Sequence, residues 1–351
     1  MVDVAVVSFA QHNAFKEDER NEVEFLQPVI KEAMSNIDLK TQDMGFVVSG
    51  SCDYLAGQAF AFVGGLDAVG PWPPLRESHV EMDGAWALYE AWIRLQHGDI
   101  DTALVYAFGK SSPGDLPRVL SLQLEPYSVA PLWPDAVSLA ALQARALMES
   151  GGVSDKDLAE VVARSRSNAT TNPAALLSGD HDVAELLAEP MYADPLRRHD
   201  CAPITDGASV IVLAAGDRAR ELSDNPAWIR GIDHRIEAQG MGLRDLATSE
   251  STRLAGEGAG VANGPVDLAE LHAPFSHQEL ILADALGLGA DTVVNPSGGA
   301  LSANVMMAAG LTRIGEAATR VSNGDGRRAV AHATSGPALQ QNLVCVLEAD
   351  K

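Results

Sequence analysis

The feature that most constrains the fold is a pattern that occurs twice along the chain. Residues 85–114 read AWALYEAWIRLQHGDIDTALVYAFGKSSPG, and residues 311–338 read LTRIGEAATRVSNGDGRRAVAHATSGPA. Each copy combines a helix-like stretch, a Gly-Asp turn, an apolar strand and a loop rich in Gly, Ser and Pro. Helices that alternate with buried strands are typical of a parallel sheet covered by helices, so two copies predict two similar α/β halves.

The rest of the chain places the boundaries of these halves. Strand-like and helix-like runs alternate regularly except at residues 113–199, which resemble an inserted, mainly helical loop domain. We therefore expect an N-terminal half at 1–215, with the insertion at about 113–199, and a C-terminal half at 216–351. The sequence also predicts that one helix runs on through residues 300–325, directly after the Gly-Gly pair.

Composition excludes several functions. The net charge of −23 opposes binding to nucleic acid or to anionic membranes, because both are polyanions. The three cysteines form no CxxC motif and no metal-ligand spacing, so we expect no bound metal and a reduced compartment. We expect the N-terminal stretch to be a first strand rather than a signal peptide, and no apolar run is long enough for a membrane span. We expect a cytoplasmic protein.

Five stretches, in order, resemble one known family. They are SGGVSDKDLAEVVARSRSNATTNPAA, HDCAPITDGASVIVLAA, ELHAPFSHQELILADALGLG, VVNPSGGALSAN and LQQNLVCVLEA. Together they resemble the thiolase superfamily, and in particular its sterol-carrier-protein and lipid-transfer-protein branch. The resemblance implies duplicated βαβαβαββ halves in five α-β-α-β-α layers, with a loop domain over the active site. It also implies acyl-CoA ligands, no covalently bound cofactor, and a dimer joined through the N-terminal half.

The chemistry of the family does not carry over with the fold. A thiolase places a nucleophilic cysteine before the helix that here begins at Gly84, and Glu81 occupies that position. The loop cysteine of the family falls at Pro274, and its "G-H-P" histidine is replaced in the stretch Ala303-Asn304-Val305, which is one residue shorter. The resemblance therefore implies a protein that cannot perform Claisen chemistry, and we expect that no cysteine is essential.

The remaining polar groups form the predicted site. His272 matches the family's loop histidine, which binds the thioester carbonyl as part of an oxyanion site. The alternative is a histidine satisfied by local backbone. Glu81 is predicted to act as a base or to be structural, while Asp83 either contacts ligand or only caps the helix. Further candidates for substrate or coenzyme A binding come from the double-glycine turn and the stretch after it, namely Asn295, Ser297, Gly298, Gly299 and Asn304.

Two functions from different classes fit these observations. The first is an aldolase that cleaves a steroid or other bulky β-hydroxyacyl-CoA by retro-aldol chemistry in lipid catabolism, with His272 as base or carbonyl donor. The second is a non-catalytic acyl-CoA or lipid-binding subunit of a heteromeric thiolase-like complex. An acyltransferase is a weaker third possibility. Expected partners are a second copy, another thiolase-like chain, or a small OB-fold acyl-CoA-binding protein. The aromatic residues Trp86, Tyr89 and Trp92 favour an oligomeric interface.

Overall fold

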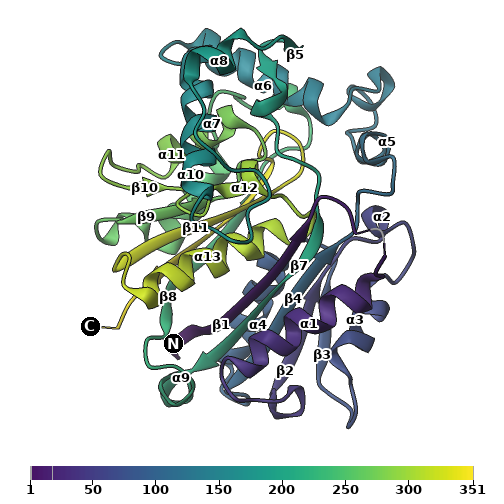
Figure 1. Cartoon of the computed structure of the whole chain (residues 1–351), viewed down its shortest axis with the longest axis vertical. Helices are drawn as coiled ribbons and strands as arrows, with labels where there is room; N and C mark the ends of the chain where they lie inside the picture. Colours follow the sequence, from purple (N-terminus) through teal and green to yellow (C-terminus); the bar gives the residue numbers. More distant parts are fainter. Residues whose placement is uncertain (1, 18, 351) are drawn as a thin grey trace.

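The central feature of the fold is one mixed sheet that contains two equivalent halves (Figure 1). This computed structural model describes residues 2–17 and 19–350, and within these the strands follow the order β10-β9-β11-β12-β8-β1-β7-β4-β2-β3. The first half contains β1 (Val4–Ala14), β2 (Phe46–Gly50), β3 (Glu77–Val80), β4 (Thr102–Gly109) and β7 (Asp206–Ala215). The second contains β8 (Ala227–Ile236), β9 (Leu268–Leu271), β10 (Val293–Val294), β11 (Arg328–Ser335) and β12 (Gln341–Glu348).

The two halves share one strand order. From the outer edge inward, β3-β2-β4-β7-β1 corresponds to β10-β9-β11-β12-β8. The halves meet where Val4, Ala5 and Val6 of β1 pair with residues 227–229 of β8, so the two five-stranded sheets join through a short antiparallel ladder. The predicted fold class is confirmed. β7 ends at Ala215, but the limits proposed for the two halves stay a prediction.

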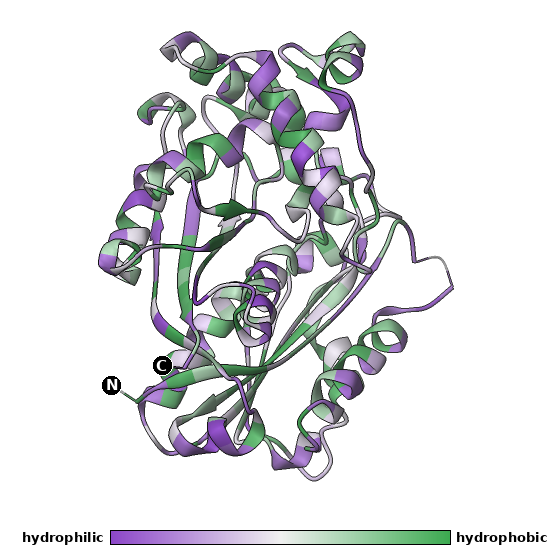
Figure 2. Cartoon of the chain, turned by 60° about the vertical axis from the view of Figure 1, so that its left-hand side comes forward, coloured by the Kyte–Doolittle hydropathy of each residue, from purple (hydrophilic) through white to green (hydrophobic). Residues whose placement is uncertain are grey.

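Helices complete five layers. The middle layer is α4 (Gly84–Gln96) and α13 (Ala309–Asn323), whose apolar side chains fill the core between the two halves of the sheet. The outer face of the first half is covered by α1 (Glu22–Ser35) and α3 (Phe62–Val69). The outer face of the second half is covered by α10 (Glu250–Ala259) and α11 (Ser276–Ala285). Figure 2 shows the apolar strands enclosed by helices whose polar residues alternate with apolar ones.

The middle helices approach the sheet at matching positions. A Cβ placed on Gly84 would lie 2.6 Å from the Cβ of Ala107, and one placed on Gly310 would lie 2.5 Å from the Cβ of Ala333. The two pairs occupy equivalent places in the repeat. In each pair the glycine lies near a helix start and the alanine lies in the strand that follows. Only glycine permits this close contact, so the sequence repeat is also a repeat of packing.

The insertion forms a helical region at the top of Figure 1, above the second half. Its helix α7 (Asp155–Ala169) packs on α11 and on α12 (Gly299–Ser302), which brings the insertion against the double-glycine turn. The other elements of this region are α5 (Leu116–Ser121), α6 (Ala136–Ser150), α8 (Val183–Ala188), β5 (Met191–Ala193) and β6 (Leu196–Arg197). Two short helices lie outside it, α2 (Asp53–Ala56) and α9 (Gly216–Leu222).

The prediction of one continuous helix over residues 300–325 is wrong. The helix stops after Ser302 and resumes at Ala309. The residues between are held by contacts outside the helix, because the Asn304 amide donates to Thr205 Oγ1 at 3.0 Å and Val305 forms a bridge with Thr205. Met307 adopts a left-handed φ of 68°. Tertiary contacts therefore override a locally helical sequence and leave Asn304 in an irregular loop.

Candidate functional site

Two helix N-termini meet at Asp83. Its carboxylate caps α4 by accepting from the Ala85 amide at 2.8 Å, and it also accepts from the Gly310 and Leu311 amides of α13 at 2.9 and 3.0 Å. Asp83 is buried, and burial raises the pKa of this carboxyl to about 6. The helix-cap interpretation is confirmed. The positive ends of both helix dipoles converge here, which favours negative charge nearby.

The segments that enter these helices cross one another. The Gly84 amide at the start of α4 donates to the Met307 carbonyl oxygen at 2.8 Å, two residues before α13 begins. Glu81 lies three residues before Gly84, and Asn304 lies three residues before Met307. The crossing thus brings the segments of two predicted site residues, far apart in sequence, to one end of the sheet.

His272 and Asn304 form a directed chain of hydrogen bonds. The Thr334 amide donates to His272 Nδ1 at 3.3 Å, and His272 Nε2 lies 3.2 Å from Asn304 Oδ1. Because Nδ1 accepts a hydrogen bond, the ring proton resides on Nε2 and is donated to Asn304. This bond fixes which end of the Asn304 amide faces His272, and it turns the Nδ2 donors of Asn304 away from the ring.

The environment of His272 bears on its two predicted roles, a base and a donor to the thioester carbonyl. His272 is buried, and burial lowers its pKa to about 3, helped by the nearby His332 and by the Arg313 cation. A ring this difficult to protonate, with Nδ1 already occupied, is a poor base. Its other nitrogen, Nε2, is engaged by Asn304, so a direct bond from His272 to a thioester carbonyl stays a prediction. The structural alternative is partly realised, since one ring nitrogen is satisfied by backbone.

Glu81 differs from the other predicted residues in being half-exposed. Its Oε1 accepts from the Asp53 amide at 2.7 Å, and its Oε2 lies 3.2 Å from His79 Nε2. The carboxylate is thus held from two sides while each oxygen keeps a lone pair for another partner. Its position at the start of the segment that crosses the 304–307 loop is compatible with acid–base work, which stays a prediction.

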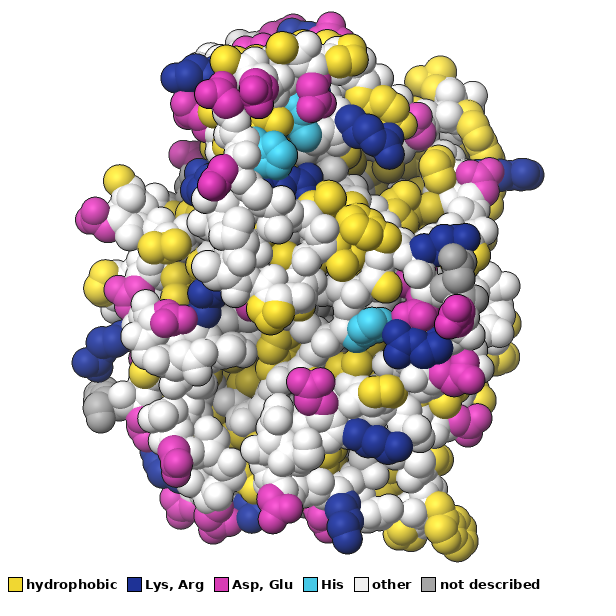
Figure 3. All heavy atoms as spheres, in the orientation of Figure 1, with side chains coloured by type: hydrophobic (Ala, Val, Ile, Leu, Met, Phe, Trp, Pro, Cys, Tyr) yellow, Lys and Arg dark blue, Asp and Glu magenta, His cyan; other side chains and the backbone are white. Residues whose placement is uncertain are grey.

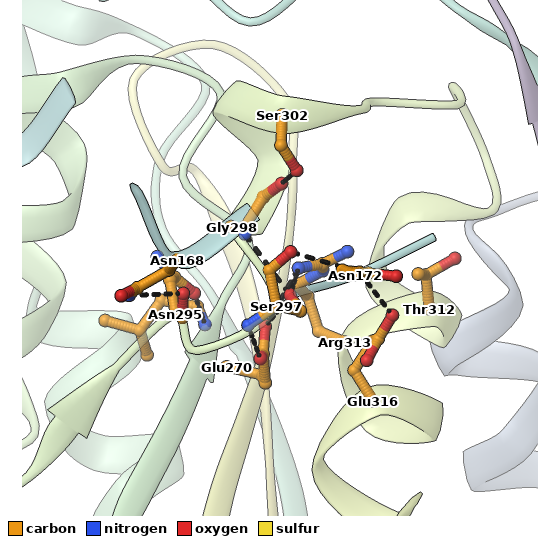
Figure 4. Close-up of polar contacts among 12 residues, drawn as sticks. Asn168, Asn172, Glu270, Asn295, Ser297, Gly298, Ser302, Thr312, Arg313 and Glu316 are labelled. Atoms are coloured by element: carbon orange, nitrogen blue, oxygen red, sulfur yellow. Dashed lines mark hydrogen bonds and ion pairs between the residues drawn. The ribbon is translucent and has the colours of Figure 1, made fainter. Parts of the chain in front are cut away.

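The double-glycine turn is held in a buried network (Figure 4). Asn295 has a left-handed φ of 49°, and its Oδ1 accepts from the Leu271 amide at 2.7 Å. Ser297 donates to Glu270 through both its amide and its hydroxyl, at 2.8 and 2.7 Å. Gly298 and Gly299 have φ angles of 94° and 63°. These four predicted residues are therefore engaged within the chain, and contact with a ligand stays a prediction for each.

Sequence reasoning missed the ion pair beneath this turn. Arg313 Nη1 lies 2.9 Å from Glu270 Oε2 and also donates to Ser297 Oγ at 2.7 Å. Asn172 of the insertion donates to the Ser297 carbonyl and to Glu316 of α13, at 3.0 and 2.9 Å (Figure 4). The available signal was a charged residue inside the apolar strand sequence LAEL. The network joins β9, α13 and the insertion around one turn.

The cysteines are poorly suited to nucleophilic chemistry. Burial raises the pKa of the Cys201 thiol to about 12, and it also raises the pKa of the Cys345 thiol in β12. Burial and the neighbouring Glu81 carboxylate raise the pKa of Cys52. All three thiols are therefore protonated near neutral pH, which weighs against an acyltransferase that uses one of them.

The hollows of the molecule lie at two different places. A surface groove of about 510 Å³ lies between the loops that enter β2, β3 and β4, and residues such as Pro73, Arg76 and Asp99 line it. A far smaller cavity of about 10 Å³ lies at the opposite ends of β2 and β4, between Cys52, Lys110 and Met307. The smaller one adjoins the crossing of the two helix-entry segments through Met307, but the residues that line it include none of the predicted site residues.

One face of the molecule carries exposed apolar side chains. Leu122, Tyr127, Leu132 and Trp133, around and after α5, are exposed, and Figure 3 shows hydrophobic side chains gathered in that upper part of the face. By contrast, the aromatic residues of α4 pack within the chain, because the Tyr89 ring meets the His234 ring edge-on at 4.8 Å. The aromatic residues of α4 therefore add little to the exposed apolar surface, which includes the region around α5 and also Phe60 and Trp72.

Comparison with known proteins agrees with this architecture. No family model matches the sequence. The acetyl-CoA acetyltransferase of Methanothermobacter thermautotrophicus is 31% identical over 227 residues, which are 57% of this chain and 58% of that protein. An Ltp2-ChsH2(DUF35) aldolase superposes with a TM-score of 0.82 at 19% identity, covering 99% of this chain and 98% of the other. The chain is therefore similar in sequence to a thiolase over part of its length, and it has a thiolase-like fold.

A second solved structure has a similar fold. A monomeric SCP2-thiolase like protein type 1 from Mycobacterium smegmatis has a TM-score of 0.77 at 19% identity, covering 99% of this chain and 78% of that one. The thiolase-like chain spans about half the length of the curated relatives that it matches first. No helix in residues 2–17 and 19–350 is long and apolar enough to cross a membrane.

Proposed function

We propose that this thiolase-like chain is an aldolase that cleaves a bulky β-hydroxyacyl-CoA, such as one with a steroid side chain. The observation that carries the proposal is the hydrogen-bond chain from the Thr334 amide through His272 to Asn304. It supplies a neutral donor in the loop that crosses the entry to α4, in a protein whose Glu81 is expected to stand in place of the thiolase cysteine. Such a site can stabilise an oxyanion and needs no covalent intermediate.

The reaction divides among a few groups. Glu81 accepts the proton of the β-hydroxyl, and the bond between the α and β carbons breaks. The electron pair of that bond moves to the thioester oxygen, where Asn304 Nδ2 stabilises the enolate. Protonation at the α carbon gives a shortened acyl-CoA, and the β carbon leaves as a ketone or aldehyde. His272 touches no reacting atom in this scheme and acts by orienting Asn304.

The second candidate is a non-catalytic acyl-CoA-binding subunit of a larger complex. It is favoured by the exposed apolar side chains around α5 and by a structural neighbour whose name describes an aldolase together with a DUF35 partner. A second copy, another thiolase-like chain or a small OB-fold protein would each fit this proposal. Purified chain, alone and mixed with each partner, should be sized by sedimentation and assayed for release of the carbonyl product.

Replacement of Asn304 by Asp tests the aldolase proposal at one atom. The change keeps the acceptor for His272 but removes the Nδ2 donors and adds a negative charge beside the enolate. We expect kcat to fall by about 10²–10³-fold, measured as product release from a β-hydroxyacyl-CoA. Asn225→Asp, at an exposed position between α9 and β8, adds the same charge and should leave kcat unchanged. A fully active N304D enzyme would contradict the proposed site.

A further inference from the structure

The Glu81 carboxylate is held by a side chain that the proposed reaction does not use. Besides the bond from the Asp53 amide, Glu81 Oε2 lies 3.2 Å from Nε2 of His79, two residues earlier in the chain. Alternate residues of a strand point to the same face, which places both side chains together at the end of β3. About half of the Glu81 side chain is exposed, against 16% of His79.

His79 is itself fixed in one orientation. Its Nδ1 lies 3.1 Å from Ser49 Oγ on the neighbouring strand β2, where Ser49 is fully buried and pairs directly with His79. The Phe62 ring of α3 stacks on the imidazole with centroids 4.5 Å apart and planes 13° apart. A hydrogen bond at one nitrogen and a stacked ring leave the other nitrogen directed at Glu81.

The arrangement tolerates either protonation state of the imidazole. The Ser49 hydroxyl can donate to Nδ1 of a neutral ring or accept from Nδ1–H of a charged one, while Nε2–H donates to Glu81 in both cases. The other charged groups that act on His79 are also acids, Glu77 of β3 and Asp53 of α2. His79 Nε2–H therefore donates to Glu81 whether the ring is neutral or charged.

We propose that His79 is a positioning residue that holds the Glu81 carboxylate for proton transfer from the substrate hydroxyl. The inference rests on the proposed function, in which Glu81 accepts that proton as the carbon–carbon bond breaks and the electron pair moves to the thioester oxygen. With Oε1 held by the Asp53 amide and Oε2 held by His79, one lone pair on each oxygen stays free for the substrate. His79 acts only through Glu81.

Kinetics of four variants test whether His79 acts through Glu81. Glu81→Gln should lower kcat by about 10²-fold. His79→Leu, which removes the donor, should lower kcat by about 10-fold with KM nearly unchanged, and His79→Gln, whose amide can still donate, should recover most of the loss. The double variant H79L/E81Q should be no slower than E81Q, because a positioning residue has nothing left to position. An equal effect of H79L in both backgrounds would overturn the inference.

Crystal structures separate this inference from the proposed function. In H79L the Glu81 carboxylate should leave the Asp53 amide, whereas Ser78→Ala, on the opposite face of the same strand, should leave it in place. A Glu81 side chain that keeps its position in H79L would overturn the positioning role. If E81Q instead retains full activity, the role of Glu81 in the proposed reaction fails, while the crystallographic result still decides whether His79 holds it.

Discussion

The two halves of the sheet share a backbone plan but differ in what they bury at one matched position. Val48 of β2 pairs with Val105 of β4, and Glu270 of β9 pairs with Ala331 of β11, so Val48 and Glu270 occupy equivalent sites. On the middle helices, Ala87 of α4 corresponds to Arg313 of α13 in the repeat. An apolar pair in one half is therefore a buried ion pair in the other.

The ion pair of Glu270 and Arg313 gives the second half polar groups that the first half lacks at the equivalent positions. Glu270 and Arg313 together provide acceptors and donors for the amide and hydroxyl of Ser297, which the equivalent valine and alanine cannot do. The pair therefore specifies the shape of the double-glycine turn, and through α12 it positions the loop that carries Asn304. A buried ion pair is weak evidence for stability by itself, so its value here is conformational.

The largest expected effect comes from breaking this pair. Arg313→Met removes the nearer of the two cations beside the buried Glu270 carboxylate and leaves Arg320, whose Nε lies 3.8 Å from Glu270 Oε1. This change should lower the free energy of unfolding by about 3 kcal/mol. The double variant E270V/R313M, which makes the second half resemble the first, should be more stable than R313M. Denaturant unfolding measures both, with Arg253→Met, at a surface ion pair on α10, as a control that should leave stability nearly unchanged. A double variant less stable than R313M would contradict this account.

A medium effect is expected from buried histidines, which the second half has and the first lacks. His332 of β11 corresponds to Tyr106 of β4 in the repeat, and burial lowers the pKa of His332 to about 4 from an ordinary value near 6.5. The unfolded chain then binds the proton more tightly, so stability is fully present above pH 6.5 and is lost as pH falls towards 4.

The variant His332→Gln sharpens this point. This variant lacks one titrating group. Between pH 6.5 and 4, the unfolding free energy of H332Q should therefore fall less steeply than that of wild type, by about 1.4 kcal/mol per pH unit. Urea unfolding at several pH values gives the slope. Burial also lowers the pKa of His277 to about 3, so H332Q should retain part of the acid sensitivity. Parallel curves for H332Q and wild type would show that His332 is not responsible.

The smallest effect concerns the first half alone. Because the Glu81 carboxylate contributes to the raised pKa of Cys52, Glu81→Gln should speed alkylation of Cys52 by about 2–3-fold near pH 8. Peptide mass spectrometry would locate the modified thiol, with the fully buried Cys345 of the second half as an internal control. Alkylated wild type should retain turnover, as expected if no cysteine is essential. Slower alkylation of Cys52 in E81Q would contradict a contribution of the Glu81 carboxylate to the raised pKa of Cys52.

The sequence by itself determined the duplication. The two copies of helix, Gly-Asp turn, strand and loop fall on α4–β4 and α13–β11, because apolar periodicity and turn residues are local properties. That Glu81 replaces the thiolase nucleophile follows from the resemblance and stays a prediction. The capping alternative for Asp83 was likewise available, since acids at helix starts are favoured by exposed amides.

Only the tertiary structure decided how these groups are used. The break between Ser302 and Ala309 arises from contacts with Thr205 and Gly84, which lie about 100 and 220 residues away in sequence, so no local pattern could reveal it. Sequence separations of 32 and 43 residues likewise hide the bond between His272 and Asn304 and the ion pair of Glu270 with Arg313. Protonation and burial depend on neighbours brought together by folding. A sequence can name the polar residues of a site, but folding assigns their partners.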